Sequence, residues 1–168
     1  STVSAGHYNA AGNGGTASVT LDAASGITVS SSTIEAGGIF TVEGTATVTL
    51  NGNSGPVQIT DSTISAYGGF DLSGFPATIS ITGNGITVSN STISATGGSG
   101  SDGIGGNATL TLDAGSGALQ IQSGSALSAT ANSASDGGSA LLDLAGNTVS
   151  ISDSTLTSMG GGAFSGPS

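Results

Sequence analysis

Apolar and polar residues alternate in short runs along the whole chain, and the same runs return about every thirty residues. The alternation has a period of two, which a β-strand with one buried face requires. Equivalent runs begin at Ile27, Val57, Ile86, Leu119 and Val149, so the successive spacings are 30, 29, 33 and 30 residues. Repetition at a fixed period of this length predicts a solenoid, in which each repeat stacks on the next.

Three β-runs recur in a fixed order within each repeat. Residues 86–88, 91–95 and 108–112 illustrate them as Ile-Thr-Val, Ser-Thr-Ile-Ser-Ala and Ala-Thr-Leu-Thr-Leu. Glycine and asparagine lie between the runs and supply the positive φ that tight corners need. We therefore predict an all-β fold, a parallel β-helix of about five to six coils, in which each of three short strands pairs with its equivalent one coil on.

The repeats vary in an insert between the second and third strands, and these inserts carry nearly all of the aromatic residues. They comprise residues 6–16, 37–45, 68–76, 97–107 and 130–139. Variable insertions in solenoids gather on one face, which is often the face that binds partners. We expect the aromatics either to cap their own coil or to form a contact surface for a partner. The candidate contact residues are Tyr8, Phe40, Tyr67, Phe70, Phe75 and Phe164.

The chain carries ten Asp and Glu residues but no Lys or Arg, which gives a formal net charge of −10. Nucleic acids and anionic membranes are bound mainly through basic residues, so neither is expected as a partner. The chain has no Cys, so it forms no disulfide, and no apolar run is long enough to span a bilayer. This composition suits an exported bacterial β-solenoid, and we expect an extracellular or cell-surface location.

The first and last runs of the chain both correspond to the second strand of a coil, and neither departs from the repeat pattern. Solenoids normally end in atypical capping repeats. We therefore expect residues 1–168 to form a single β-helical module. The module would be a section of a longer fibre, a tandem unit, or a subunit that stacks on copies of itself.

No arrangement of residues points to catalysis. His7 is the only histidine, and the chain offers it no cysteine or second histidine with which to share a metal ion. Glycoside hydrolysis needs a facing pair of carboxylates, but carboxylates in equivalent positions, such as Asp61 and Asp153, fall three coils apart. At about 4.8 Å per coil, their separation would be roughly 14 Å. We predict that the protein is not an enzyme and that it has no cofactor.

Residues 97–105 fit the calcium-binding nonapeptide Gly-Gly-x-Gly-x-Asp-x-apolar-x, with Asp102 as the acidic residue. Such sites form from consecutive copies of the pattern, because neighbouring turns share the ion. Here the pattern occurs once. A plain glycine-rich insert is the preferred interpretation, and a calcium site is the alternative.

The outward positions of the third strand form rows of Ser and Thr, which β-helical ice-binding proteins also display. Ser and Thr suit exposed positions in any sheet, so the rows alone do not define a function. In the fifth repeat we expect the rows to break at Leu142 and Asp143. The positions in the first four repeats are Ser18/Thr20, Thr47/Thr49, Thr78/Ser80 and Thr109/Thr111.

The repeats resemble those of filamentous haemagglutinin-type exoproteins, the large bacterial adhesins of the two-partner secretion route. The resemblance rests on Gly-Ile-Thr-Val-Ser, Ser-Thr-Ile-Ser-Ala-x-Gly-Gly and Ala-Thr-Leu-Thr-Leu-Asp-Ala-Gly-Ser-Gly, and it covers essentially the whole chain. It implies a right-handed parallel β-helix, export to the cell surface, and a role as the shaft of an adhesin or filament. Family coils are often nearer twenty residues, and the insert accounts for the longer coils here.

The sequence thus predicts a structural module of an extracellular bacterial filament or adhesin. Its partners would be copies of itself, joined end to end, in tandem or laterally, and a glycan or protein on a host or neighbouring cell. The first alternative is a receptor- or glycan-binding module that uses the corner inserts. The second alternative is an ice-binding protein that uses the threonine rows.

Overall fold

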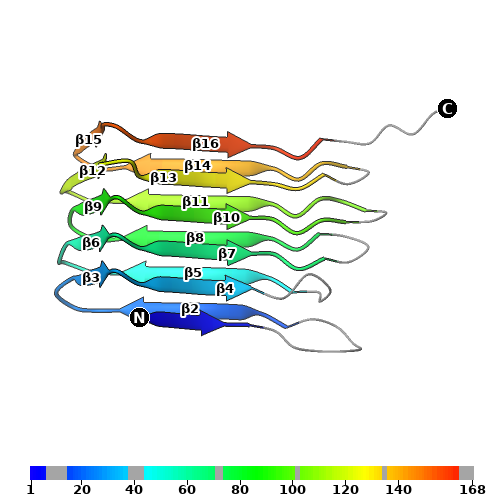
Figure 1. The fold of residues 1–168 in the computed structure, drawn as a ribbon, viewed down its shortest axis with the longest axis horizontal. Coiled ribbons are helices and arrows are strands. Elements are labelled where there is room, and N and C mark those ends of the chain that lie inside the picture. The colour runs from blue at the N-terminus through cyan, green and yellow to red at the C-terminus, as the bar shows by residue number, and fades with distance from the viewer. Residues whose placement is uncertain (7–14, 38–43, 71–73, 101–102, 134–135, 163–168) are drawn as a thin grey trace.

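The computed structural model describes residues 1–6, 15–37, 44–70, 74–100, 103–133 and 136–162. Sixteen strands, β1 to β16, form three parallel sheets, and no helix occurs in these ranges. Consecutive strands of the chain belong to different sheets, so each strand pairs with its equivalent one coil on (Figure 1). The predicted parallel β-helix with three strands per coil is therefore confirmed.

Each sheet collects one of the three recurring strand types. Sheet A contains β1 (Thr2–Ala5), β4 (Thr33–Gly37), β7 (Thr63–Tyr67), β10 (Thr92–Thr96), β13 (Ala126–Thr130) and β16 (Thr155–Met159). Sheet B contains β2 (Ala17–Asp22), β5 (Ala46–Asn51), β8 (Ala77–Thr82), β11 (Ala108–Asp113) and β14 (Ala140–Ala145). Sheet C contains β3 (Ile27–Ser30), β6 (Val57–Thr60), β9 (Ile86–Ser89), β12 (Ala118–Gln122) and β15 (Thr148–Ile151).

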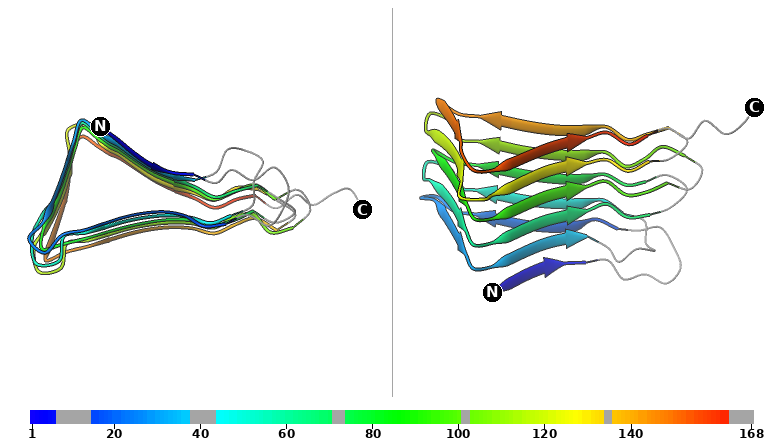
Figure 2. Two further views of the ribbon diagram at one scale, coloured as in Figure 1. Left: turned by 90° about the horizontal axis from the view of Figure 1, so that it is seen from below. Right: turned by 45° about the horizontal axis from the view of Figure 1, so that its top comes forward.

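Viewed along its axis, the coil is a narrow triangle (Figure 2, left). Sheets A and B form the two long sides and sheet C the short side, and A and B converge toward the corner that bears the inserts. In this view from the N-terminal end, the chain runs clockwise as it moves away from the viewer. The β-helix is therefore right-handed, as crossovers between parallel strands almost always are.

Side-chain size in the core follows the taper of the triangle. At the wide end, buried columns consist of Val, Ile and Leu, such as Ile64 over Ile93 in sheet A. Nearer the converging corner, both sheets switch to alanine, such as Ala95 in β10 and Ala108 in β11. Since interiors are packed to crystal-like density, converging walls leave room only for smaller side chains.

At the corner itself, the two sheet ends are in contact through their backbones. A Cβ added to Gly98 would overlap the carbonyl oxygen of Gly69, and one added to Gly97 would overlap that of Gly106. Only glycine fits where two backbones approach so closely. We call these positions the glycine seam: Gly68, Gly74, Gly97, Gly98, Gly105, Gly106, Gly137, Gly138 and Gly161.

Hydrogen bonds cross the glycine seam from one side to the other. The Gly98 N–H donates to the Phe75 carbonyl at 2.8 Å, and the Gly106 N–H donates to the Gly98 carbonyl at 2.8 Å. Further along the axis, the Gly161 N–H donates to the Gly138 carbonyl at 2.9 Å. The seam therefore adds a backbone ladder to the ladders of the three sheets, at the base of the inserts.

A second row of polar contacts, here called the serine ladder, closes the corner between sheets C and A. The Ser62 N–H donates to Ser91 Oγ at 3.1 Å, and the Ser91 hydroxyl donates to the Ser89 carbonyl at 2.7 Å. The residue before the ladder serine turns the corner with positive φ, as Asn90 does at 46°. Each buried hydroxyl thus satisfies two backbone groups that the corner leaves free. The ladder serines are Ser32, Ser62, Ser91 and Ser125.

The inserts are confirmed at one corner, but coil length also varies at the turn from sheet B to sheet C. Residues 52–56 connect β5 to β6, whereas residues 83–85 connect β8 to β9. In the fourth coil, Ser123 and Gly124 together take the corner place that Asn90 fills alone. The prediction that all length variation lies in the inserts is therefore wrong, because glycine and asparagine turns absorb extra residues on the surface.

The last coil leaves inward-facing apolar side chains uncovered by described residues. Val149 and Ile151 are each 46% exposed, although they continue the columns of the fully buried Leu119 and Ile121. In the part of the chain that the structure describes, no helix is long and apolar enough to cross a membrane.

Candidate functional site

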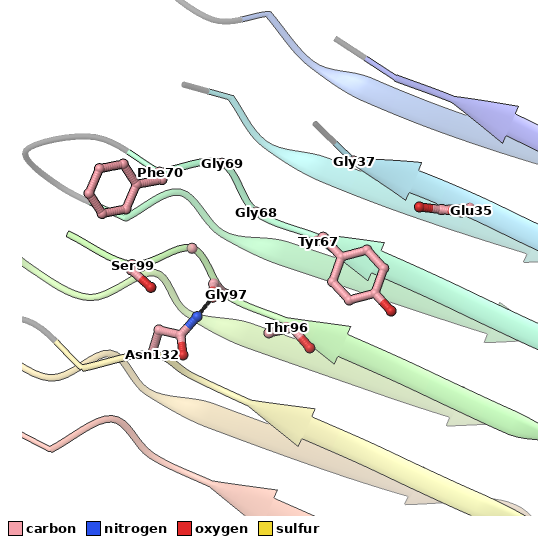
Figure 3. Close-up of a pocket in the computed structure, with 11 residues that line it drawn as sticks. Glu35, Gly37, Tyr67, Gly68, Gly69, Phe70, Thr96, Gly97, Ser99 and Asn132 are labelled. Atoms are coloured by element: carbon pink, nitrogen blue, oxygen red, sulfur yellow. Dashed lines mark hydrogen bonds between the residues drawn. The ribbon is translucent and has the colours of Figure 1, made fainter. Parts of the chain in front are cut away.

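A groove of about 330 Å³ opens on the outer face of sheet A, beside the glycine seam. Two aromatic rings, Tyr67 and Phe70, line one side, and Thr96, Ser99 and Asn132 line the facing side (Figure 3). Its lining residues are Glu35, Gly37, Tyr67, Gly68, Gly69, Phe70, Thr96, Gly97, Gly98, Ser99 and Asn132.

Strand register places the principal aromatic of the groove. Tyr67 ends β7 and follows the buried Ala66, so strand alternation directs its side chain outward. Its partners across the sheet are Gly37 in β4 and Thr96 in β10. A Cβ at Gly37 would lie only 2.8 Å from the Tyr67 carbonyl oxygen, so this neighbouring position stays bare. Position 37 therefore places no side chain beside the Tyr67 ring, and Tyr67 is 41% exposed.

The polar side chains of the groove supply both donors and acceptors. Glu35 lies on the outer face of β4 and brings a carboxylate. The Asn132 side-chain amide donates to the Gly97 carbonyl at 2.6 Å, which fixes the amide and leaves its Oδ1 able to accept. Thr96 and Ser99 add hydroxyls. The groove can therefore hydrogen-bond and stack on a ligand, but it presents no cation, since the chain has no Lys or Arg.

The structure brings only part of the predicted aromatic surface together. Tyr67 and Phe70, 41% and 44% exposed, share the groove. Phe75 is half-buried and does not line the groove, because it lies at the glycine seam, where its carbonyl accepts from the Gly98 N–H. The remaining candidates, Tyr8, Phe40 and Phe164, lie outside the described residues.

Glu35, Thr96 and Asn132 were not among the predicted site residues. Glu35 and Asn132 could have been noticed, because each differs from the residue at the equivalent position of neighbouring coils. Glu35 stands where the equivalent strands have Ser65 and Ser94. Asn132 stands where the preceding coil has Gly98, two residues past the end of the strand pair. Two of the groove residues thus depart from the residues at equivalent positions in other coils, whereas Thr96 matches Thr130 and carries no such signal.

Within the described ranges, the carboxylates considered for catalysis are not gathered into a site. Among the described residues, no group of three His, Cys, Asp or Glu side chains could hold a metal ion. Asp61 accepts from the Asn90 amide at 2.6 Å at a corner, and Asp22 accepts from the Asn53 amide at 2.6 Å in a turn. These carboxylates serve local turns. His7 and Asp102 lie outside the described residues.

The threonine rows of sheet B are in register over four coils. Ser18, Thr47, Thr78 and Thr109 form one column. The column continues to Leu141, which is 53% exposed, and Asp143 ends the neighbouring column. The predicted break at Leu142 is wrong by one residue, because Leu142 pairs with the buried Leu110 and packs against the core.

No protein-family model, no curated protein and no solved structure matches the chain. The resemblance to filamentous haemagglutinin-type exoproteins therefore stays a prediction.

Proposed function

We propose that the chain is a structural module of an extracellular bacterial surface filament, in which stacked coils form a stiff shaft. The observation that carries the proposal is the continuity of like residues along the axis in all three sheets. Ile27, Val57, Ile86, Leu119 and Val149 form one unbroken inward column. Repeat units that contact only their neighbours extend a structure along one axis without changing its cross-section.

The uncovered last coil supports continuation of the shaft. The side chains that face inward in the last coil remain open on their axial side, where a further coil would bury them: Val149, Ile151 and the partly buried Leu142, Leu144 and Leu156. Unpaired strand edges also promote pairing with another strand. Apolar columns and sheet edges therefore both favour one occupant, which is another coil of the same repeat.

Electron microscopy of the native protein tests the shaft. We expect rods of constant width that are much longer than the roughly 30 Å occupied by six coils. Ile151→Glu places a charge in the inward column and should break or shorten the rods, whereas Ser150→Glu, on the outer face of the same strand, should leave them unchanged. Discrete particles of about six coils in the unmodified protein would disprove the filament.

Ice binding is the second candidate, and the four-coil register of the threonine rows favours it. Thr47 and Thr49 lie on the outer face of β5, within columns of Ser and Thr. We expect thermal hysteresis to persist in Thr47→Val, which keeps the side-chain shape, and to vanish in Thr49→Tyr, which interrupts the surface. An unmodified protein without thermal hysteresis would eliminate this candidate.

A further inference from the structure

Aromatic side chains are absent from the described core, which is built from Ala, Val, Ile and Leu. Tyr67 and Phe70 instead line a groove on the surface, where each residue is about two-fifths exposed. Exposed aromatic area of this kind is unfavourable unless something covers it, and clustered apolar surface marks binding sites. These two aromatic residues favour a ligand with an apolar face.

The polar groups of the groove call for a ligand rich in hydroxyls. The Glu35 carboxylate only accepts hydrogen bonds, the Thr96 hydroxyl both donates and accepts, and the Asn132 Oδ1 is an acceptor. A pyranose ring combines the two requirements, since its C–H face packs on an aromatic ring while its rim carries hydroxyls. An aliphatic ligand would leave these polar groups unpaired.

Charge narrows the class of carbohydrate. The chain has no Lys or Arg and a net charge of −10, and the groove itself contains Glu35. Like charges in proximity repel, so a uronate, sialate or sulfated sugar is disfavoured here. An extended peptide also fits poorly. The groove lies on the face of sheet A, where β4, β7 and β10 already pair on both edges, so no strand edge is free to add a peptide strand.

The length of the groove favours a chain of sugars over a single one. Its lining residues come from four successive coils, from Glu35 in β4 to Asn132 just after β13. At about 4.8 Å per coil, they cover roughly 14 Å along the axis. We infer that the groove of Glu35, Tyr67, Phe70, Thr96 and Asn132 binds an uncharged oligosaccharide.

Titration calorimetry with cellohexaose, maltohexaose, chitohexaose and hexagalacturonic acid tests the inference. We expect at least one of the three uncharged oligosaccharides to bind and hexagalacturonic acid not to bind. Tyr67→Ala should weaken that binding at least tenfold, because the stacking ring is lost. Tyr67→Phe should weaken the binding less than Tyr67→Ala does. Glu35→Gln should weaken the binding several-fold, because the amide accepts hydrogen bonds less strongly than the carboxylate.

Thr111→Val serves as the matched control, since Thr111 lies on the outer face of sheet B, away from the groove. It should bind like the unmodified protein, and circular dichroism should show the same β content in every variant. The inference is overturned if none of the three uncharged oligosaccharides binds, if Tyr67→Ala binds as tightly as the unmodified protein, or if hexagalacturonic acid binds most tightly. It is also overturned if Tyr67→Ala abolishes self-association instead of sugar binding. The sugar-binding measurements do not depend on whether the protein forms rods.

Discussion

At the residue scale, the inward side chains become smaller as the coil narrows, from Leu and Ile, through Ala, to Gly. Ile93 and Leu110 fill the wide end, Ala95 and Ala108 the converging part, and Gly98 and Gly106 the corner. The sequence pattern alone assigns glycine to turns, where positive φ is the usual reason. At the glycine seam the reason is different, because two backbones touch and leave no space for a Cβ.

Gly98→Ala tests the glycine seam. The added Cβ would overlap a backbone oxygen, which cannot move aside as a flexible side chain can. We expect the free energy of unfolding to fall by at least about 4 kcal/mol, or the protein not to fold. Urea denaturation followed by circular dichroism measures the change.

Gly160→Ala is the matched control for the glycine seam. A Cβ at Gly160 would meet the Gly138 carbonyl oxygen at 3.6 Å, an ordinary van der Waals contact. Its free energy of unfolding should change by only about 0.5 kcal/mol. Equal effects of the two substitutions would contradict the proposed role of the seam.

At the element scale, the strands themselves could be predicted, because apolar alternation determines which face of each strand is buried. The predicted run 86–88 became β9, Ile86–Ser89, and equivalent strands pair in the predicted order. The groove could not be predicted in the same way. It depends on which side chains of four different coils meet on the outer face of sheet A and just past its strand ends, and Asn132 and Glu35 are distant in sequence.

Ser91→Ala tests the corner that joins β9 to β10. It removes the acceptor of the buried Ser62 N–H and the donor to the Ser89 carbonyl. Since buried polar groups left without partners are costly, we expect a loss of about 1–3 kcal/mol in the free energy of unfolding. Ser150→Ala, at an exposed position in β15, should have little effect. A Ser91→Ala protein as stable as Ser150→Ala would argue against the serine ladder.

At the scale of the whole molecule, the coil is an interchangeable unit. Val57 pairs with Ile27 on one side and with Ile86 on the other. Deletion of residues 57–85 would join Pro56 to Ile86 and would place Ile86 against Ile27 in the same register. Because stability in such arrays comes from neighbouring repeats, the shortened protein should fold.

Circular dichroism and size-exclusion chromatography measure the outcome of this deletion. We expect a folded β-protein that has lost Tyr67, Phe70 and the groove between them. Deletion of residues 57–70, about half a coil, shifts every later strand to the wrong sheet and should give misfolded or aggregated protein. Aggregation of both deletion variants would show that the coils are not interchangeable.

The glycine seam has a consequence for engineering. The Gly98 N–H donates to the Phe75 carbonyl and the Gly106 N–H donates to the Gly98 carbonyl, so hydrogen bonds hold both ends of the segment between Gly98 and Gly106 at the glycine seam. A foreign peptide inserted between two such ends would start and end at fixed points, whatever its own sequence. The shaft could then carry several different grafted peptides side by side, one per coil, at a spacing set by the sheets.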